Sequence, residues 1–283
     1  MLGLSLAITL SGLVSAPGAA QDAPDDVRRG FFWANAWANH HTARAGGDGR
    51  FAMAGARRME RMVRLIHRRD ADVGVLVEME RPQVRAFRRA SAGRYAMVTG
   101  GTPGRGIYDG VFYDTDAYRL VDSYHFRSWT KHGRRARVPV VFLDDRRTGQ
   151  RIAVMAVHHA AFGSGSRWRE RALDREIAEI RRLRRTHGPG VTVFIAGDFN
   201  STERAYCRMR KAGLSSPVRP AKRCENTPVG IDQLFGDRAA RFSGYRRIVR
   251  PDITDHPAVY VARFRLAAPA VSAPGRGLSA ARG

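Results

Sequence analysis

Short apolar runs rich in β-branched residues recur along the chain, and such runs are typical of buried strands. The runs predict strands over residues 30–37, 72–77, 110–113, 138–143, 152–157, 191–196, 230–235 and 258–264. Short loops separate the runs, so the pattern indicates a globular chain rather than a disordered one.

Two further stretches have the period of an amphipathic helix. The apolar residues at helical spacing are Met59, Met62, Val63 and Ile66 in the first stretch, and Leu173, Ile177, Ile180 and Leu183 within residues 168–185. Arginines occupy the opposite face of the first stretch. Strands mixed with helices predict a layered α/β fold, and we expect one domain over residues 28–266.

Polar residues that can carry chemistry lie at the ends of several runs. Glu78 and His158 each end a run, Gly-Asp-Phe-Asn at 197–200 follows another, and Thr-Asp-His at 254–256 precedes the last. A rigid scaffold presents a site in this way. Carboxylates, an amide and histidines together suit a divalent metal ion and a phosphate, which indicates an enzyme.

The Gly-Asp-Phe-Asn motif allows two interpretations. In an extended strand Asp198 and Asn200 point to the same side, while Phe199 points into the packing. Gly197 then permits a close approach of the backbone. The alternative is an ordinary Gly-Asp turn with an Asn cap.

Glu78 ends a run that is otherwise apolar, so its carboxylate needs a cation or hydrogen-bond donors. A metal ion is one candidate, and a salt bridge to an arginine is the other. Glu80 could share the same face, but Arg-Pro at residues 81–82 indicates that the strand has ended by then. Asn35 lies in an aromatic run, and a site would supply the partners that its amide needs.

Histidines are the remaining candidates for acid–base chemistry. Asp255 and His256 diverge in an extended segment, so one can face a metal ion and the other a phosphate. Asp232 is a candidate to hold the His256 ring in one tautomer. His158 is followed by His159, and histidines from two sites at one phosphate would provide a base and an acid.

The charge of the chain is strongly positive. Lys and Arg number 49 against 26 Asp and Glu, which gives a formal net charge of +23. Only three residues are lysine, so the basic charge is almost entirely arginine. One interpretation is a codon bias that fills solvated faces with arginine. The other is attraction to polyanions such as nucleic acid or anionic lipid headgroups, and the two are compatible.

Both ends of the chain differ in composition from the predicted domain. Residues 2–14 are apolar but too few to cross a bilayer, and small residues follow at 15–20. This pattern predicts a signal peptide over residues 1–20, export to the extracellular space and no transmembrane span. Residues 267–283 are rich in Ala, Pro, Gly and Ser and predict a disordered tail.

The cysteine content agrees with export. Cys207 and Cys224 are the only cysteines. In an oxidising compartment they can close one disulfide, and the alternative is two unpaired thiols.

The order of the candidate residues along the chain indicates a family. Asn35, Glu78, His158, the 197–200 motif, Ile-Asp at 231–232 and the 254–256 motif together resemble the endonuclease/exonuclease/phosphatase superfamily, which has the DNase I-like fold. The segment Asn-Ala-Trp-Ala-Asn-His-His-Thr at 35–42 makes the chain similar to secreted bacterial members.

By that resemblance, the fold is a four-layered α/β sandwich of two mixed β-sheets flanked by helices, with the site at one edge. Glu78 would bind Mg²⁺, with Asn35 and Asp255 near the same ion. Mn²⁺ and Ca²⁺ are the alternatives. Mg²⁺ takes few carboxylates and keeps waters, which suits so small a number of acids.

The resemblance also implies the catalytic roles. Asp198 and Asn200 would position the attacking water and the phosphate. His256, oriented by Asp232, would act on the water or the phosphate. His158 would bind the opposite phosphate oxygens and stabilise or protonate them. The reaction would be in-line attack of water on phosphorus.

The chain departs from the family pattern at a few positions. Val77 stands where a glutamine usually precedes the glutamate, and Gln233 stands where a tyrosine usually follows the Ile-Asp pair. The doublet leaves either His158 or His159 facing the site, and the match to the family favours His158. Tyr108 is the candidate for a phosphate-contacting residue in the middle of the chain.

The substrate stays open at the level of sequence. We expect a secreted phosphodiesterase or nuclease that acts on DNA or RNA as a monomer without a stable protein partner. The alternatives are a lipid phosphodiesterase, a phosphomonoesterase, and a non-catalytic basic protein that binds polyanions on the same scaffold.

Overall fold

The computed structural model describes residues 27–42, 53–102, 104, 106–130, 133–161 and 163–267. The predicted signal peptide at 1–20 and all but the first residue of the predicted tail at 267–283 lie outside these residues. Among the described residues, no helix combines the length and the apolar character needed to span a membrane.

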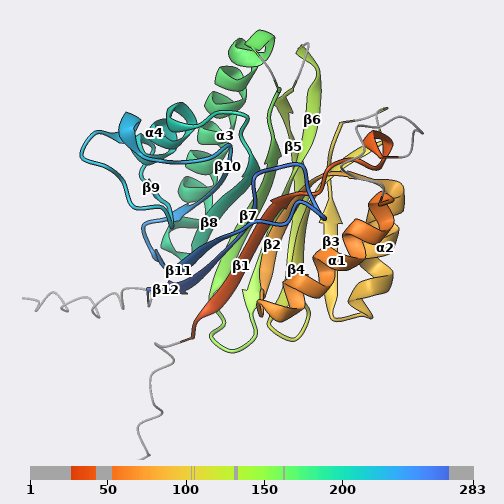
Figure 1. Cartoon of the computed structure of the whole chain (residues 1–283). Coiled ribbons are helices and arrows are strands. Elements are labelled where there is room, and N and C mark those ends of the chain that lie inside the picture. Colours follow the sequence, from red (N-terminus) through yellow and green to blue (C-terminus); the bar gives the residue numbers. More distant parts are fainter. Residues whose placement is uncertain are drawn as a thin grey trace, which may run out of the picture.

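The strands form two sheets of six strands each (Figure 1). The first sheet has the order β11-β12-β1-β2-β4-β3, and the second has the order β5-β6-β7-β8-β10-β9. In each sheet one central pair is parallel, β1 with β2 and β7 with β8, and the other neighbours are antiparallel. Both sheets are therefore mixed.

The bounds of the elements are as follows. The first sheet contains β1 (Arg29–Asn35), β2 (Val73–Glu80), β3 (Tyr95–Thr99), β4 (Ile107–Asp114), β11 (Ala240–Ile248) and β12 (Val259–Leu266). The second contains β5 (Tyr118–Trp129), β6 (Arg135–Asp145), β7 (Arg151–His158), β8 (Val191–Asp198), β9 (Leu214–Ser215) and β10 (Asp232–Asp237). The helices are α1 (Gly55–Arg68), α2 (Arg81–Ser91), α3 (Ser166–His187) and α4 (Glu203–Lys211), with short 3₁₀ turns η1 (Asn39–His41), η3 (Gly163–Gly165), η4 (Gly188–Gly190) and η5 (Cys224–Asn226).

Three apolar cores hold four layers together. One core lies between the two sheets and includes Phe31, Val75, Val154 and Phe194. The other two fill the outer faces of the sheets, where α1 and α2 cover the first sheet and α3 and α4 cover the second. The structure confirms the predicted four-layered α/β sandwich of two mixed sheets.

Helix α2 is the main element that the sequence pattern misses. Pro82 lies in its first turn, where the missing N–H of proline leaves no hydrogen bond unmade. Glu80 is the N-cap, and it forms a capping box with Gln83. The Arg-Pro pair therefore marks the start of a helix directly after β2, and β2 continues three residues beyond the predicted end at 77.

The sequence pattern also misses β3, β5, β9 and β11. Strand β5 pairs only with β6, at the edge of its sheet, and most of its side chains are partly or fully exposed. An edge strand whose two faces are largely exposed to solvent has no continuous apolar run that would predict it.

A disulfide joins Cys207 in α4 to Cys224 in η5, with 5.6 Å between the two Cα atoms. The predicted pairing is therefore present in the structure. The bond closes the loop that follows the 197–200 motif and carries the chain back towards β10.

Candidate active site

Seven polar residues from the two sheets meet at one edge of the sandwich. Parallel neighbours end at the same edge of a sheet, and an antiparallel neighbour starts there. The contributing positions are Asn35, Glu78, His158 and Asp198 at the ends of β1, β2, β7 and β8, Asp109 and Asp232 near the starts of β4 and β10, and His256 just before β12. Strand register thus brings together residues that lie far apart in the sequence.

Asp198 lies at the centre of this edge and is 2% exposed. Asn200 holds both of its oxygens: the Asn200 backbone N–H donates to Oδ1 at 2.7 Å, and Nδ2 donates to Oδ2 at 2.9 Å. The backbone of Asn200 is left-handed, with φ of 45°, so the two side chains meet through a turn and not through strand alternation as predicted. Phe199 is fully buried, in agreement with the prediction.

Gly197 is required by a close backbone contact, as predicted. Its φ of 138° is unfavourable for other residues, and a Cβ atom would lie 2.0 Å from the carbonyl oxygen of Val157. The β7 and β8 backbones can therefore approach closely just before both strands deliver their polar residues.

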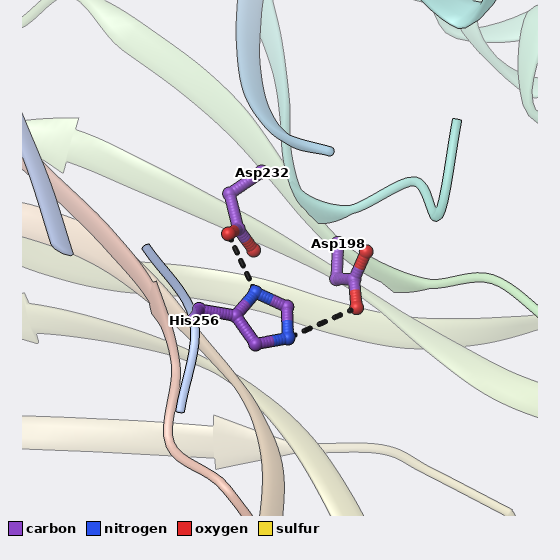
Figure 2. Close-up of side chains that lie close together, drawn as sticks. All are labelled: Asp198, Asp232 and His256. Carbon is purple, nitrogen blue, oxygen red and sulfur yellow. Dashed lines mark hydrogen bonds and ion pairs between the residues drawn. The ribbon is translucent and has the colours of Figure 1, made fainter. Parts of the chain in front are cut away.

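Asp232 and His256 form the hydrogen bond that the sequence analysis expects. His256 Nδ1 lies 2.6 Å from Asp232 Oδ2, and His256 Nε2 lies 3.7 Å from Asp198 Oδ2 (Figure 2). Burial disfavours the charged ring, but Asp232 outweighs it and raises the pKa of His256 to about 9. Burial raises the pKa of Asp232 to about 6. In the absence of a metal ion, the Asp232 carboxylate thus favours the protonated form of the His256 ring.

His158, and not His159, faces the site. His158 Nε2 lies 3.6 Å from Asp198 Oδ2 and 3.9 Å from Glu78 Oε2. The next ring is almost completely buried, and its Nε2 lies 2.9 Å from Glu176 Oε2 on α3. Successive residues at a strand end point to opposite faces, so only one histidine of the doublet reaches the site.

Asp109 is a site residue that the sequence analysis misses. Its Oδ1 lies 3.7 Å from His158 Nδ1 and accepts the backbone N–H of Glu78 at 3.1 Å. Burial disfavours a charged ring at His158, but Asp109 and then Asp198 and Glu78 raise the pKa of His158 to about 10. The available signal was an acid just before the apolar run at 110–113, at the start of a strand instead of its end.

The expectation that Tyr108 contacts the phosphate is wrong, because its side chain lies away from the site. Its side chain packs against the apolar core beneath α1 and α2, on the outer face of the first sheet. Asp109, one position later, points to the opposite side of the strand and takes the place beside His158. Because side chains alternate between the two faces of a strand, the residue next to Tyr108 faces the site and Tyr108 does not.

Glu78 leaves the regular strand to reach the site. Its φ is 57°, and a bulge interrupts the β2–β4 register between Leu76 and Met79. The carboxylate accepts Asn35 Nδ2 at 2.7 Å and lies 3.3 Å from His41 Nε2. Burial opposes ionisation, but His41, His158 and Asn35 outweigh it and lower the pKa of Glu78 to about 2.

His41 is a second site residue that no sequence pattern indicates, because a loop and not a strand brings it to Glu78. The loop passes through Trp37, whose φ is 50°, and the His41 ring stacks on the Trp37 indole. Beneath it, the buried guanidinium of Arg58 lies 4.7 Å from the indole centroid and donates to the Trp37 carbonyl oxygen. Gln83 Nε2 donates to the same carbonyl oxygen at 3.0 Å.

Asn35 and Asp255, two of the three predicted metal ligands, do not have the contacts expected of residues that bind one ion together with Glu78. Asn35 directs Nδ2 towards Glu78 and Asp198, while its Oδ1 accepts the Trp37 N–H at 2.8 Å. This amide holds carboxylates in place and has its oxygen engaged elsewhere. Asp255 has an exposed side chain, but neighbouring atoms partly cover its carboxyl group. This partial desolvation and the charge of Glu78 raise the pKa of Asp255, and His256 opposes them. Metal binding by Asn35 and Asp255 stays a prediction.

The two departures from the family pattern have structural explanations. Val77 is fully buried between the two sheets, where a polar side chain would lack partners. Gln233 Nε2 donates to the carbonyl oxygens of Ser201, Thr202 and Gly230. It therefore ties the loop that follows Asn200 to the start of β10.

The site fits a divalent cation. Glu78, Asp109, Asp198 and Asp232 are carboxylates gathered in a small space, and no arginine of the described chain forms an ion pair with any of them. Among the described residues, none forms a hydrogen bond with the buried Oδ1 of Asp232. Donor atoms of Asp198, Asp232 and His256 lie within 4.8 Å of one another. Oxygen-rich clusters of this kind suit Mg²⁺, Mn²⁺ or Ca²⁺.

The family model of the endonuclease/exonuclease/phosphatase family matches residues 32–256, well over half of the chain. The chain belongs to the endonuclease/exonuclease/phosphatase family. Members of this family hydrolyse phosphate esters and include nucleases and phosphatases. Among curated proteins no significant match is found.

Solved structures agree with the family's DNase I-like fold. A Bacteroides vulgatus family member has a TM-score of 0.68 at 16% identity, over 85% of this chain and 99% of its own. The human nocturnin catalytic domain with bound sulfate has a TM-score of 0.64 at 15% identity, over 84% and 94%. A Bacteroides thetaiotaomicron mannosyl-6-phosphatase has a TM-score of 0.62 at 16% identity, over 85% and 100%. At these identities the likeness concerns the fold alone.

Proposed function

We propose that this chain is a divalent-metal-dependent phosphodiesterase that acts on nucleic acid. The observation that carries the proposal is the linked group of Asp232, His256 and Asp198, with 2.6 Å and 3.7 Å between the linked atoms (Figure 2). On the other side of Asp198 lies His158, at 3.6 Å. Two cationic rings therefore flank one buried carboxylate, which is the arrangement needed to hold an anionic phosphate next to a water-orienting acid.

Glu78 is the residue best suited to hold the ion, with Asp255 beside it. Glu78 ionises readily, because its pKa is lowered to about 2, and its neighbours are histidines and an amide that can be displaced or turned. Bound Mg²⁺ or Mn²⁺ would polarise a phosphate oxygen and neutralise developing charge. Asn35 would keep the Glu78 and Asp198 carboxylates in register, since Nδ2 contacts both.

The protein residues would divide the reaction between them. Asp198, fixed by Asn200, would accept a hydrogen bond from the attacking water and orient it towards phosphorus. As the new P–O bond forms, the water would pass a proton to Asp198. The ester P–O bond on the opposite side would break, and its leaving oxygen would take a proton from His158. His256 and His158 would donate hydrogen bonds to phosphate oxygens, and Asp232 and Asp109 would keep these two rings charged and oriented.

The test is a panel of phosphate esters with the full chain. The panel comprises an oligodeoxynucleotide, RNA, bis-p-nitrophenyl phosphate, sphingomyelin and a sugar 6-phosphate, each with Mg²⁺, Mn²⁺ or EDTA. We expect diester cleavage that needs the metal ion and is lost in His256→Ala. His67→Ala removes a half-buried ring from α1, on the outer face of the first sheet, and should retain the activity. Metal-independent turnover, or preference for the sugar phosphate or the lipid, would refute the nucleic-acid phosphodiesterase.

We also propose that the protein is exported. The signal-like segment at 1–20 motivates this, and the Cys207–Cys224 disulfide suits an oxidising compartment. The test is expression in a bacterial host, followed by N-terminal sequencing of the protein recovered from the culture medium. A mature protein that begins near residue 21 is the expected result, and intact protein retained in the cells would contradict it.

A further inference from the structure

A cluster of two tryptophans and three arginines stands beside the site and has no role in the chemistry above. Trp129 ends β5 and Trp168 lies in the first turn of α3. Their rings are stacked, with 5.3 Å between the centroids and 26° between the planes. Figure 1 shows the β5–β6 hairpin and one end of α3 close together at the same end of the molecule.

Three guanidinium groups cover the two indoles. Arg135 lies 4.5 Å from the Trp129 ring centroid, and Arg167 lies 4.4 Å from that of Trp168. Arg171 contacts both rings, at 5.4 and 5.1 Å. Cation–π contacts of this kind hold each guanidinium over a ring and leave its N–H edge directed outward. We call these five residues the Trp–Arg platform.

The platform is fixed by the packing of the hairpin. The hairpin closes with a hydrogen bond from the Thr130 N–H to the Arg134 carbonyl oxygen at 2.8 Å. Gly133, with φ of 70°, lies so close to Trp168 that a Cβ atom would be 2.8 Å from the indole ring. Gly133 is therefore packed against the indole, which limits the freedom that the neighbouring Arg135 has left to lose on binding a ligand.

The charge of the platform is not neutralised within the described chain. No carboxylate among the described residues forms an ion pair with the three platform arginines. The acids on the same stretch of α3 are engaged elsewhere, since Glu170 pairs with Arg204 and Arg208 of α4. Three exposed, unpaired guanidiniums in one place suit a polyanion.

The hairpin that carries part of the platform also borders a cavity at the site. The cavity has a volume of about 130 Å³, and its walls include Thr130 and Arg134 of the hairpin and Asp109 and His158 of the site. Thr130 and Arg134 directly follow Trp129 and precede Arg135 in the sequence. A polymer with one phosphate at His158 would therefore run along the hairpin past Arg134, in the direction of the platform.

We infer that the Trp–Arg platform binds the phosphate backbone of a polynucleotide whose scissile phosphate lies at His158 and His256. The inference rests on the proposed function and specifies its substrate as a polymer and not a small ester. Arginine held on an aromatic ring is suited both to phosphate oxygens and to stacking with a base. A lipid surface fits less well, because the exposed large apolar side chains, Leu120, Val121, Tyr245 and Val249, all lie outside the platform.

The test compares two triple variants of equal charge. The first is Arg135→Gln/Arg167→Gln/Arg171→Gln, and the control is Arg85→Gln/Arg88→Gln/Arg89→Gln, which removes three exposed arginines from α2 on the other side of the molecule. Binding of a fluorescent single-stranded oligodeoxynucleotide is followed by anisotropy in EDTA over a range of salt concentrations. Melting curves check that both variants fold.

We expect the platform variant to bind at least about tenfold more weakly than the control, with the slope of log K against log salt reduced by about 2. In Mg²⁺, the platform variant should cleave the oligonucleotide more slowly than the control and turn over bis-p-nitrophenyl phosphate at an equal rate. Equal oligonucleotide affinity of the two variants overturns the inference. If neither variant turns over any substrate but the platform variant still binds the oligonucleotide more weakly than the control, the proposed function is refuted and the role of the platform in binding is retained.

Discussion

The two edges of the sandwich treat their acidic residues in opposite ways. At the edge away from the site, Asp145 accepts Arg29 at 2.7 Å, Asp114 accepts Arg94 at 2.7 Å, and Asp144 accepts Arg151 at 2.6 Å. At the site edge the acids contact histidines and amides instead. A chain with 49 Lys and Arg residues could have paired every acid with a guanidinium, and at the site edge of the described structure it does not.

This difference separates stability from chemistry. A guanidinium never gives up its proton, so an Arg–carboxylate pair is fixed and saturates the acid. Histidines and amides hold a carboxylate with weaker, adjustable contacts, which leaves it able to bind a metal ion or a water. We therefore expect substitutions at the two edges to have opposite consequences.

The largest effect is expected from His256→Ala at the site edge. The variant removes a ring that both neighbours the phosphate position and is held by Asp232 at 2.6 Å. Turnover should fall by about a thousandfold, in the range for loss of a general acid or base. Steady-state kinetics with an oligonucleotide measure this loss. A variant with near-normal kcat would remove His256 from the mechanism.

The next effect concerns the opposite edge. Arg29→Leu leaves Asp145, which is 4% exposed, without its cation, and also removes the 3.3 Å contact to Asp72. Loss of one partner of a buried pair should lower the free energy of unfolding by about 3 kcal/mol. Urea denaturation measures this change. The kcat of the folded variant should match the wild type, and a large loss of kcat without a loss of stability would erase the distinction between the edges.

A smaller effect is expected from pH in the metal-free protein. The folded pKa values of His256 and His158, about 9 and about 10, are above the ordinary value near 6.5. Their stabilising contribution is therefore complete below about pH 6.5 and is lost as the pH rises towards 10. In EDTA, the free energy of unfolding of the wild type should fall more between pH 6 and pH 10 than that of His158→Gln/His256→Gln.

At the edge away from the site, the free energy of unfolding should depend on pH in the reverse direction. Burial opposes ionisation of Asp145, but Arg29 and the backbone N–H groups of Arg147 and Thr148 together outweigh it and lower the pKa of Asp145. The pair with Arg29 therefore stabilises the protein above the ordinary carboxyl pKa and loses its contribution as the pH falls. Acid denaturation of wild type and Arg29→Leu should converge at low pH. A constant difference between them at all pH values would contradict the assignment.

The sequence predicts the parts of this molecule that depend on local pattern. Buried strands of the sheet centres, helices α1 and α3, the disulfide and the fold were predicted, and so was the hydrogen bond from His256 to Asp232. These features follow from apolar periodicity, from pairing of two cysteines and from the family resemblance.

The rest depends on register and on loops. Asp109 reaches His158 only because β4 runs antiparallel to β2, which places the start of one strand beside the end of the other. His41 reaches Glu78 through a turn at Trp37. No sequence pattern indicates either contact, because each joins segments that are separated by tens of residues.

The most direct test of the account is the same substitution at both edges. Asp198→Asn and Asp144→Asn each remove one negative charge, the first beside His256 and the second from the pair with Arg151. Mg²⁺-dependent cleavage of an oligonucleotide is measured for both. The account predicts that Asp198→Asn loses at least about a hundredfold in kcat while Asp144→Asn stays within about twofold of the wild type. Substantial activity in Asp198→Asn would contradict the claim that this edge of the sandwich performs the chemistry.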